Sequence, residues 1–121
     1  MNIEELRELC MNVKGAEECM PFDEDTMVYK VMGKMFAYFP LTPKNGDFCV
    51  NMKCDPEKTL ELRDRYNGIV KAIHVGDSLM WNTIYIQSDV PDKLIKDLIT
   101  HSVSEVIKKL PKIRQKEYRE L

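Results

Sequence analysis

Residues 47–53 alternate between apolar and polar side chains, the period-two pattern of a strand with one buried face. The apolar positions are Phe48, Val50 and Met52. Directly after this segment, Asp55 is suited to cap a helix and Pro56 is suited to its first position. The pattern therefore predicts a strand at 47–53 and a helix from residue 55 to about residue 66.

Similar patterns predict the other elements. A capping-box pattern at Asn2 begins a helix that ends near Gly15, and the strongest apolar stripe begins a helix at Pro91 that ends before Pro111. Two further pairs of strands are predicted. The first pair is at 26–31 and 35–40, and the second pair is at 69–75 and 81–87. Residues 15–25 are expected to form a loop with Phe22 packed inward. Residues 112–121 are expected to form either a short tail helix or a frayed basic end.

The predicted order is α-βββ-α-ββ-α, which indicates an α+β fold. We expect two layers, with a five-stranded antiparallel sheet and helices on one of its faces. A chain of 121 residues is long enough for one domain and too short for two ordinary ones. Residues 1–121 are therefore expected to form a single domain.

The composition is that of a globular protein, with 44% hydrophobic and 31% charged residues. No stretch approaches the roughly 20 apolar residues that cross a bilayer, and the first residues lack the basic and apolar regions of a signal peptide. We expect a cytoplasmic protein with no membrane partner. The four cysteines are expected to be reduced, and their spacing from the two histidines fits no zinc site, so no metal or cofactor is expected.

Charge is distributed unevenly along the chain. The formal net charge is −2, which gives no overall attraction to nucleic acid. The first quarter is acidic, whereas residues 108–119 carry Lys108, Lys109, Lys112, Arg114, Lys116 and Arg119. These cations either interact favourably with the helix dipole and keep this end of the chain soluble, or form the contact surface for an anionic partner.

Strand alternation assigns one set of side chains to the sheet face that no helix covers. The set is Lys30, Asn51, Lys53, Trp81 and Tyr85. Lysines and aromatic rings suit contact with nucleic acid, but tryptophan and tyrosine are equally frequent anchors of protein interfaces. Trp81 itself has a packing interpretation as well as a binding one.

Other polar residues have a structural and a functional interpretation. Asn82 either satisfies turn backbone groups or recognises a base, and His74 is either a neutral structural residue or a binding or proton-transfer group. His101 is expected at a core boundary. Cys54 begins a helix, which lowers a thiol pKa, but the neighbouring Asp55 opposes that effect. No motif assembles a nucleophile with a base, so we do not expect an enzyme.

Several spaced motifs resemble the MmcQ/YjbR family of small bacterial proteins. They are Pro21-Phe22, Asp25-Thr26-Met27-Val28-Tyr29-Lys30-Val31, Gly33-Lys34-Met35-Phe36-Ala37, Asn51-Met52-Lys53-Cys54-Asp55-Pro56 and Trp81-Asn82-Thr83-Ile84. The resemblance extends from the first helix to residue 112. It implies a two-layer fold of the secretion-chaperone-like type and DNA binding through a double-wing arrangement, with no shared catalytic activity.

The chain departs from the family pattern just before the tryptophan. Family members often carry a histidine and basic residues there, whereas this chain has Gly76-Asp77-Ser78-Leu79-Met80. If those basic residues contact phosphate in relatives, the contact is weaker or absent here.

Two hypotheses follow. The first is a DNA-binding module that uses two hairpins as wings, with Lys30, Lys34, Lys53, Trp81, Lys108, Lys109, Lys112 and Arg114 on the duplex. The second is a protein-interaction or chaperone-like adaptor that uses the open sheet face around Trp81 and Tyr85, with an interaction face of Asn51, His74, Asn82 and Tyr85.

Overall fold

The computed structural model describes residues 1–72 and 79–121. In this part of the chain there are four helices and six strands. The helices are α1 (Ile3–Met11), α2 (Pro56–Arg65), α3 (Asp92–Lys108) and α4 (Lys112–Arg119). The strands are β1 (Glu17–Cys19), β2 (Thr26–Val31), β3 (Lys34–Pro40), β4 (Cys49–Lys53), β5 (Ile69–Lys71) and β6 (Trp81–Tyr85).

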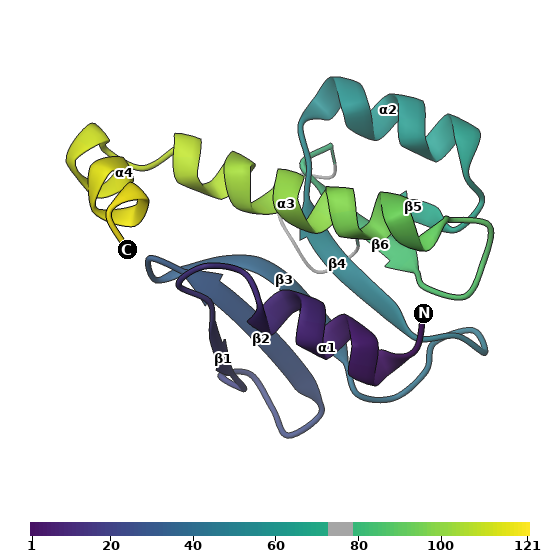
Figure 1. Ribbon diagram of the computed structural model, residues 1–121. Coiled ribbons are helices and arrows are strands. Elements are labelled where there is room, and N and C mark those ends of the chain that lie inside the picture. Colours follow the sequence, from purple (N-terminus) through teal and green to yellow (C-terminus); the bar gives the residue numbers. More distant parts are fainter. Residues whose placement is uncertain (73–78) are drawn as a thin grey trace.

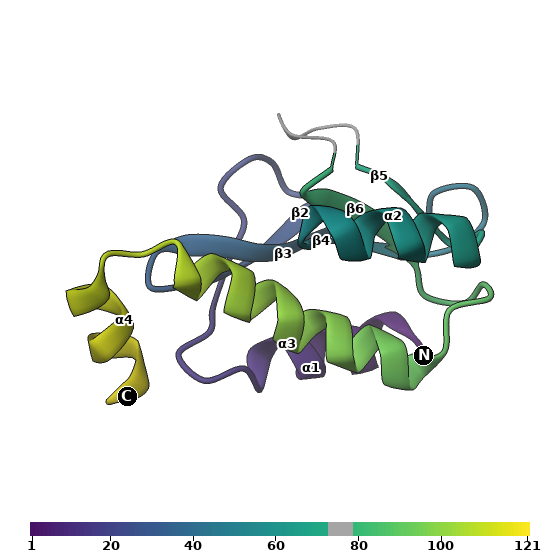
Figure 2. The same ribbon diagram turned by 90° about the horizontal axis from the view of Figure 1, so that it is seen from above.

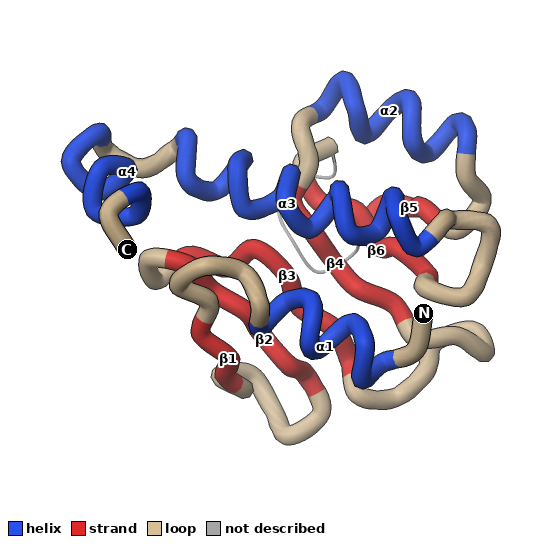
Figure 3. The backbone as a smooth tube through the Cα atoms, in the orientation of Figure 1, coloured by secondary structure: helices blue, strands red, loops and turns tan. Residues whose placement is uncertain are grey.

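The strands form one antiparallel sheet in the order β1-β2-β3-β4-β6-β5. Helices α1 and α3 lie together on one side of this sheet, and α2 lies beside its β5–β6 end (Figure 1). Figure 2 shows the two layers edge-on, and Figure 3 separates the strands from the helices by colour. The predicted α+β class with helices against one sheet face is confirmed.

The sheet has one more strand than the five that the sequence predicts. Glu17–Cys19, in the segment expected to be a loop, pairs with β2 as the edge strand β1. The Glu18 carboxylate accepts hydrogen bonds from the Tyr29 hydroxyl at 2.6 Å and from the Arg7 guanidinium at 2.7 and 2.8 Å. A three-residue strand is too short for a periodic signal, and contacts from β2 and α1 hold it in place.

Phe22 does not pack inward as expected, because 68% of its surface is exposed. The loop that carries it is instead tied back at Asp25, whose backbone N–H donates to the Asp23 carboxylate and whose carbonyl accepts from Leu41 N. Backbone and side-chain hydrogen bonds therefore anchor this connector, without burial of its aromatic ring.

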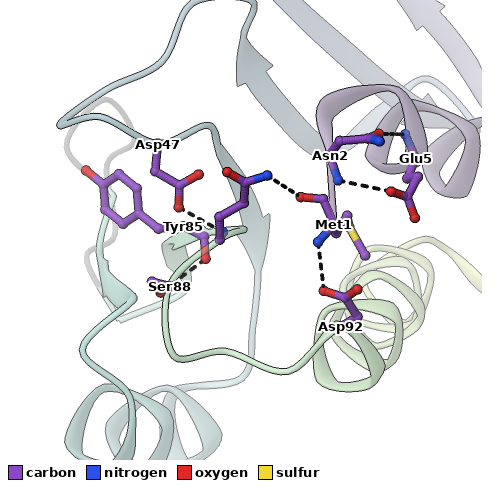
Figure 4. Close-up of polar contacts among 8 residues, drawn as sticks. Met1, Asn2, Glu5, Asp47, Tyr85, Ser88 and Asp92 are labelled. Atoms are coloured by element: carbon purple, nitrogen blue, oxygen red, sulfur yellow. Dashed lines mark hydrogen bonds and ion pairs between the residues drawn. The ribbon is translucent and has the colours of Figure 1, made fainter.

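The predicted capping box of α1 is present. The Asn2 side chain accepts a hydrogen bond from Glu5 N, and the Glu5 carboxylate accepts one from Asn2 N. Figure 4 shows this pair beside the N-terminal ammonium group of Met1, which forms an ion pair with Asp92 at 3.2 Å. These contacts join the start of α1 to the start of α3.

The turn between β2 and β3 has two residues, Met32 and Gly33, with φ angles of 51° and 77°. Positive φ at both positions is characteristic of the type I′ turn, whose twist matches that of the flanking strands. Beyond the turn, the register shifts between Tyr29 and Lys30, so that Phe36 has no opposite residue. This β-bulge places both Phe36 and Ala37 in the core.

Helix α3 covers β3 and β4 with the apolar stripe that the sequence predicts. Ile95, Leu98 and Ile99 are among its buried residues. Asp55 caps α2 as expected, because its side chain accepts hydrogen bonds from Glu57 N and Lys58 N. No helix in the described part of the chain combines the length and apolar character needed to cross a membrane.

Candidate functional site

Four of the predicted site residues line one pocket of about 380 Å³. Lys34 comes from the start of β3, Lys53 from the end of β4, Trp81 from the start of β6, and Lys109 from the end of α3. The other lining residues are Met35, Val106 and Leu110. The pocket therefore combines three ammonium groups with an indole ring and apolar walls.

The backbone creates this pocket where two strands separate. The ladder between β3 and β4 contains the pairs Ala37–Met52 and Tyr38–Asn51, and it stops before Phe36 and Lys53. There the Ser102 hydroxyl on α3 donates to the Phe36 carbonyl and accepts from Lys53 N at 3.0 Å. The bulge at Phe36 opens the ladder, and Ser102 satisfies the two backbone groups that would otherwise lose their partners.

Strands β4 and β6 remain paired at the same level, with Lys53 directly opposite Trp81. Directly opposite residues of an antiparallel pair project from the same face of the sheet. The cross-strand register therefore places the Lys53 ammonium group and the indole side by side at the pocket.

Two lysines of the pocket, Lys53 and Lys109, interact with each other. Burial lowers the pKa of Lys53, and the nearby Lys109 lowers it further. Lys109 itself contacts the Met80 sulfur at 3.6 Å. The buried Glu105 carboxylate lies close by, but it forms a 2.6 Å ion pair with Lys108. Among the described residues, no ion pair to a carboxylate joins Lys34, Lys53 or Lys109.

Trp81 is partly exposed and packs on one side against Tyr38, with ring centroids 5.7 Å apart and ring planes at 50°. The Tyr38 hydroxyl is buried and has no hydrogen-bond partner in the described part of the chain. Burial raises the pKa of Tyr38. Tyr38 therefore serves as an apolar support that fixes the indole plane at the pocket.

The remaining predicted DNA contacts lie on β2, at the end of α3 and on α4. Lys30 pairs with Met35 across the β2–β3 ladder and with Glu17 on its other side. Lys108 lies beside the pocket in its ion pair with Glu105. On α4, Lys112 is exposed, while Arg114 forms a 2.7 Å ion pair with Glu117 and donates to the Met32 carbonyl at 3.5 Å. The last contact brings the basic C-terminal helix to the tip of the β2–β3 hairpin.

Two residues of the predicted interaction face do lie on the uncovered side of the sheet. Asn51 is only 8% exposed, because its side chain donates to the Tyr38 carbonyl and accepts from the Thr83 hydroxyl. The Tyr85 hydroxyl accepts a 2.9 Å hydrogen bond from Asn45. The hydrogen-bonding groups of Asn51 are thus already used within the sheet.

The placement of Asn82 on that face is wrong. Asn82 is 1% exposed and points toward the helices, where it donates to the Thr59 hydroxyl at 3.0 Å and accepts from Arg63 at 2.7 Å. It follows Trp81 directly in the same strand, so alternation turns it to the opposite side. His74 lies outside the described residues.

His, Cys, Asp and Glu side chains are the usual ligands of metal ions, and two such residues, Cys54 and His101, lie near the start of α2. Within residues 1–72 and 79–121, no group of three or more His, Cys, Asp or Glu side chains could hold a metal ion. The Cys54 thiol is buried, and burial raises its pKa despite its place before α2. His101 accepts a hydrogen bond from Asp55 N at 3.2 Å, and burial lowers its pKa. His101 therefore satisfies a backbone N–H at the start of α2, beside the buried Cys54.

Three residues that shape the pocket were not identified from the sequence. Ser102 lies within the apolar stripe of α3, and Glu105 looks like a surface charge on the same helix. Tyr38 could have been placed behind Trp81, because its position in β3 alternates with the core residues Ala37 and Phe39. The bulge at Phe36, which sequence alternation does not reveal, obscures this pattern.

Comparisons with known proteins agree on one family. A model of the YjbR family matches residues 11–103. The chain is 29% identical to the uncharacterized Escherichia coli protein YbdF over 96% of this chain and 93% of that one. It is 28% identical to the uncharacterized Escherichia coli protein YjbR, over 96% of both chains.

Two solved structures are similar. The Deinococcus radiodurans protein DR2400, with a DUF419 domain, has a TM-score of 0.85 and 30% identity over 97% of this chain and 87% of that chain. A Pseudomonas syringae protein has a TM-score of 0.72 and 23% identity over 84% of this chain and 96% of that chain, which supports the fold alone.

Proposed function

We propose that this chain, which belongs to the YjbR family, is a small non-enzymatic module that binds DNA at the pocket of Lys34, Lys53, Trp81 and Lys109. The observation that carries the proposal is the convergence of three lysines and one indole from β3, β4, β6 and the end of α3. Lysine neutralises backbone phosphate, which supplies most of the affinity of nucleic-acid binding. Because the net charge of the chain is −2, DNA binding requires such a local concentration of positive charge.

The surroundings of the pocket support this function. Lys30 lies next to Met35 of the pocket wall, and Arg114 links α4 to the hairpin turn through the Met32 carbonyl. The β2–β3 hairpin and helix α4 thus each contribute a cation, Lys30 and Arg114 respectively, near the hairpin that carries Lys34. Arg114 and Lys108 are partly neutralised by Glu117 and Glu105, so the proposal gives them a smaller share of the binding energy.

The proposed role is tested by fluorescence anisotropy of labelled DNA at several salt concentrations. The test variant is Lys53→Ala, Lys109→Ala, and the matched control is Lys93→Ala, Lys96→Ala, which removes two cations from the other end of α3. Each lost phosphate contact reduces the slope of log K against log salt by about 0.7 to 0.9. We expect weaker binding and a slope lower by about 1.5 in the test variant only.

A protein partner on the uncovered sheet face is the second proposal. Val70 is exposed on β5, directly across from Thr83 of β6, and Trp81 and Tyr85 follow on the same face. This short apolar row suits an interface anchor. Absence of DNA binding at low salt, in the native protein, would refute the first proposal and favour this one.

A further inference from the structure

We infer that the lysine pocket takes single-stranded nucleic acid, with one unstacked base against Trp81 and the adjacent phosphates on Lys34, Lys53 and Lys109. This inference rests on the proposed DNA-binding function and adds to it the class of strand that the site selects. Shape, wall chemistry and charge of the pocket each support it.

The shape of the site favours a strand whose bases are free. The bases of a duplex are read by an element, such as a helix or a β-ribbon, that enters a groove. Trp81 and the three lysines instead line a concave pocket of about 380 Å³, within the range that encloses a single small molecule. One splayed nucleotide fits such a recess, whereas the bases of a duplex remain stacked inside the helix.

The walls of the pocket are mixed in a way that matches one nucleotide. Met35, Val106 and Leu110 provide apolar surface beside the indole, and apolar surface favours a base over a phosphate. The indole is already held in place by the Tyr38 ring, at 5.7 Å between centroids. A fixed aromatic plane can stack a base of any identity, which is how sequence-tolerant single-strand sites work.

The charges of the pocket call for an anion. Lys53 is partly buried, and its closeness to Lys109 brings two like charges together. The Glu105 carboxylate acts on Lys53 and raises its pKa, but it forms its ion pair with Lys108, at 2.6 Å. Among the described residues no carboxylate forms an ion pair with Lys34, Lys53 or Lys109. A phosphate between these ammonium groups would remove the repulsion.

The test compares four labelled or competing ligands with the native protein at one salt concentration. They are a 12-nucleotide single strand, the matching 12-base-pair duplex, an abasic strand of equal length and charge, and a mononucleotide as competitor. The intrinsic fluorescence of the single tryptophan is recorded in parallel. No variant is needed for these measurements, so a folding defect cannot confuse them.

We expect the single strand to bind at least tenfold more tightly than the duplex and about tenfold more tightly than the abasic strand, with quenching of Trp81 fluorescence. Trp81→Leu, which keeps an apolar side chain without a stacking surface, should abolish the difference between the normal and abasic strands. A mononucleotide that competes as well as the strand would overturn the assignment of a strand. Duplex binding as tight as single-strand binding would overturn the inference and leave the proposed DNA-binding function intact. No binding of any DNA at low salt would overturn both the inference and the proposed function.

Discussion

Lys53 at the end of β4 donates its backbone N–H to the side-chain hydroxyl of Ser102 on α3, at 3.0 Å. The same hydroxyl donates to the Phe36 carbonyl of β3, so one helix residue closes the gap where β3 and β4 separate. The lysine pocket lies at this gap. The geometry of the candidate site therefore depends on a buried polar residue that does not line it.

Replacement of Ser102 by alanine should lower the free energy of unfolding by about 1–3 kcal/mol. The variant leaves the partly buried Lys53 N–H and the buried Phe36 carbonyl without partners, and each lost partner costs the desolvation of its group. Thr100→Ala is the matched control, because Thr100 is exposed on the same helix and its hydroxyl donates to the Lys96 carbonyl one turn earlier. Urea denaturation measures both, and equal stability of the two variants would contradict the bridging role.

Met32→Asn should stabilise the protein by about 0.5–1 kcal/mol. Met32 has a φ of 51°, a left-handed conformation that asparagine adopts more readily than methionine. Gly33→Ala provides the opposite control, with an expected loss of about 1 kcal/mol, because Gly33 has a φ of 77°. An added Cβ at Gly33 meets no atom within 4 Å, so the loss would report backbone strain alone. Thermal unfolding midpoints that move in the same direction for both variants would refute this account of the turn.

The stability of the protein should fall as the pH is lowered from 7.5 to 5.5, in part because of His101. Burial and then Lys58 lower its pKa in the folded protein below the ordinary value of 6.5. As the pH falls, the unfolded chain therefore binds a proton at His101 before the folded protein does. The contribution of neutral His101 to stability is complete above about pH 6.5 and is lost as the pH falls toward the pKa of His101 in the folded protein.

The His101→Gln variant tests this assignment, because glutamine can still accept the hydrogen bond from Asp55 N but does not titrate. Urea denaturation at pH 7.5 and pH 5.5 should show a smaller stability difference in this variant than in the native protein. An identical difference in both proteins would assign the pH dependence to other groups.

Only one of the four thiols should react rapidly with a thiol reagent at pH 8. Burial raises the pKa of Cys10 to about 12 and that of Cys49 to about 11, and it raises the pKa of Cys54 as well. All three are buried, whereas Cys19 on the edge strand β1 is partly exposed. Since the thiolate is the reactive form, Cys19→Ser should remove the fast phase. A fast phase that survives this substitution would show that a buried thiol is accessible.

DNA binding should weaken with rising pH sooner in the native protein than in the Lys53→Arg variant. The pKa of Lys53 lies below its ordinary value because of burial and of Lys109, so this side chain loses its proton at a lower pH than an ordinary lysine does. Arginine keeps its charge throughout. Anisotropy titrations between pH 7 and pH 10 make the comparison, and parallel curves for the two proteins would exclude Lys53 from the contact with phosphate.

The sequence by itself determined those elements whose signals are local. The capping box at Asn2, the cap at Asp55, the strands β2 and β4 and the stripe of α3 all appear as predicted, because each depends on neighbours within a few residues. Burial in β4 does not follow the predicted alternation, because Cys49 and Asn51 are buried as well as Val50 and Met52. The same alternation placed Lys53 and Trp81 on one sheet face, and their direct pairing across β4 and β6 agrees with it.

Tertiary structure decided the rest. Edge strand β1 forms because Arg7 and Tyr29 hold Glu18, and the pocket forms because a bulge at Phe36 separates two strands whose ends Ser102 then bridges. These are contacts between residues far apart in the chain. A local pattern can assign a residue to a face, but only packing decides where a ladder stops, which side chains fill the gap, and whether Lys34, Lys53 and Lys109 meet.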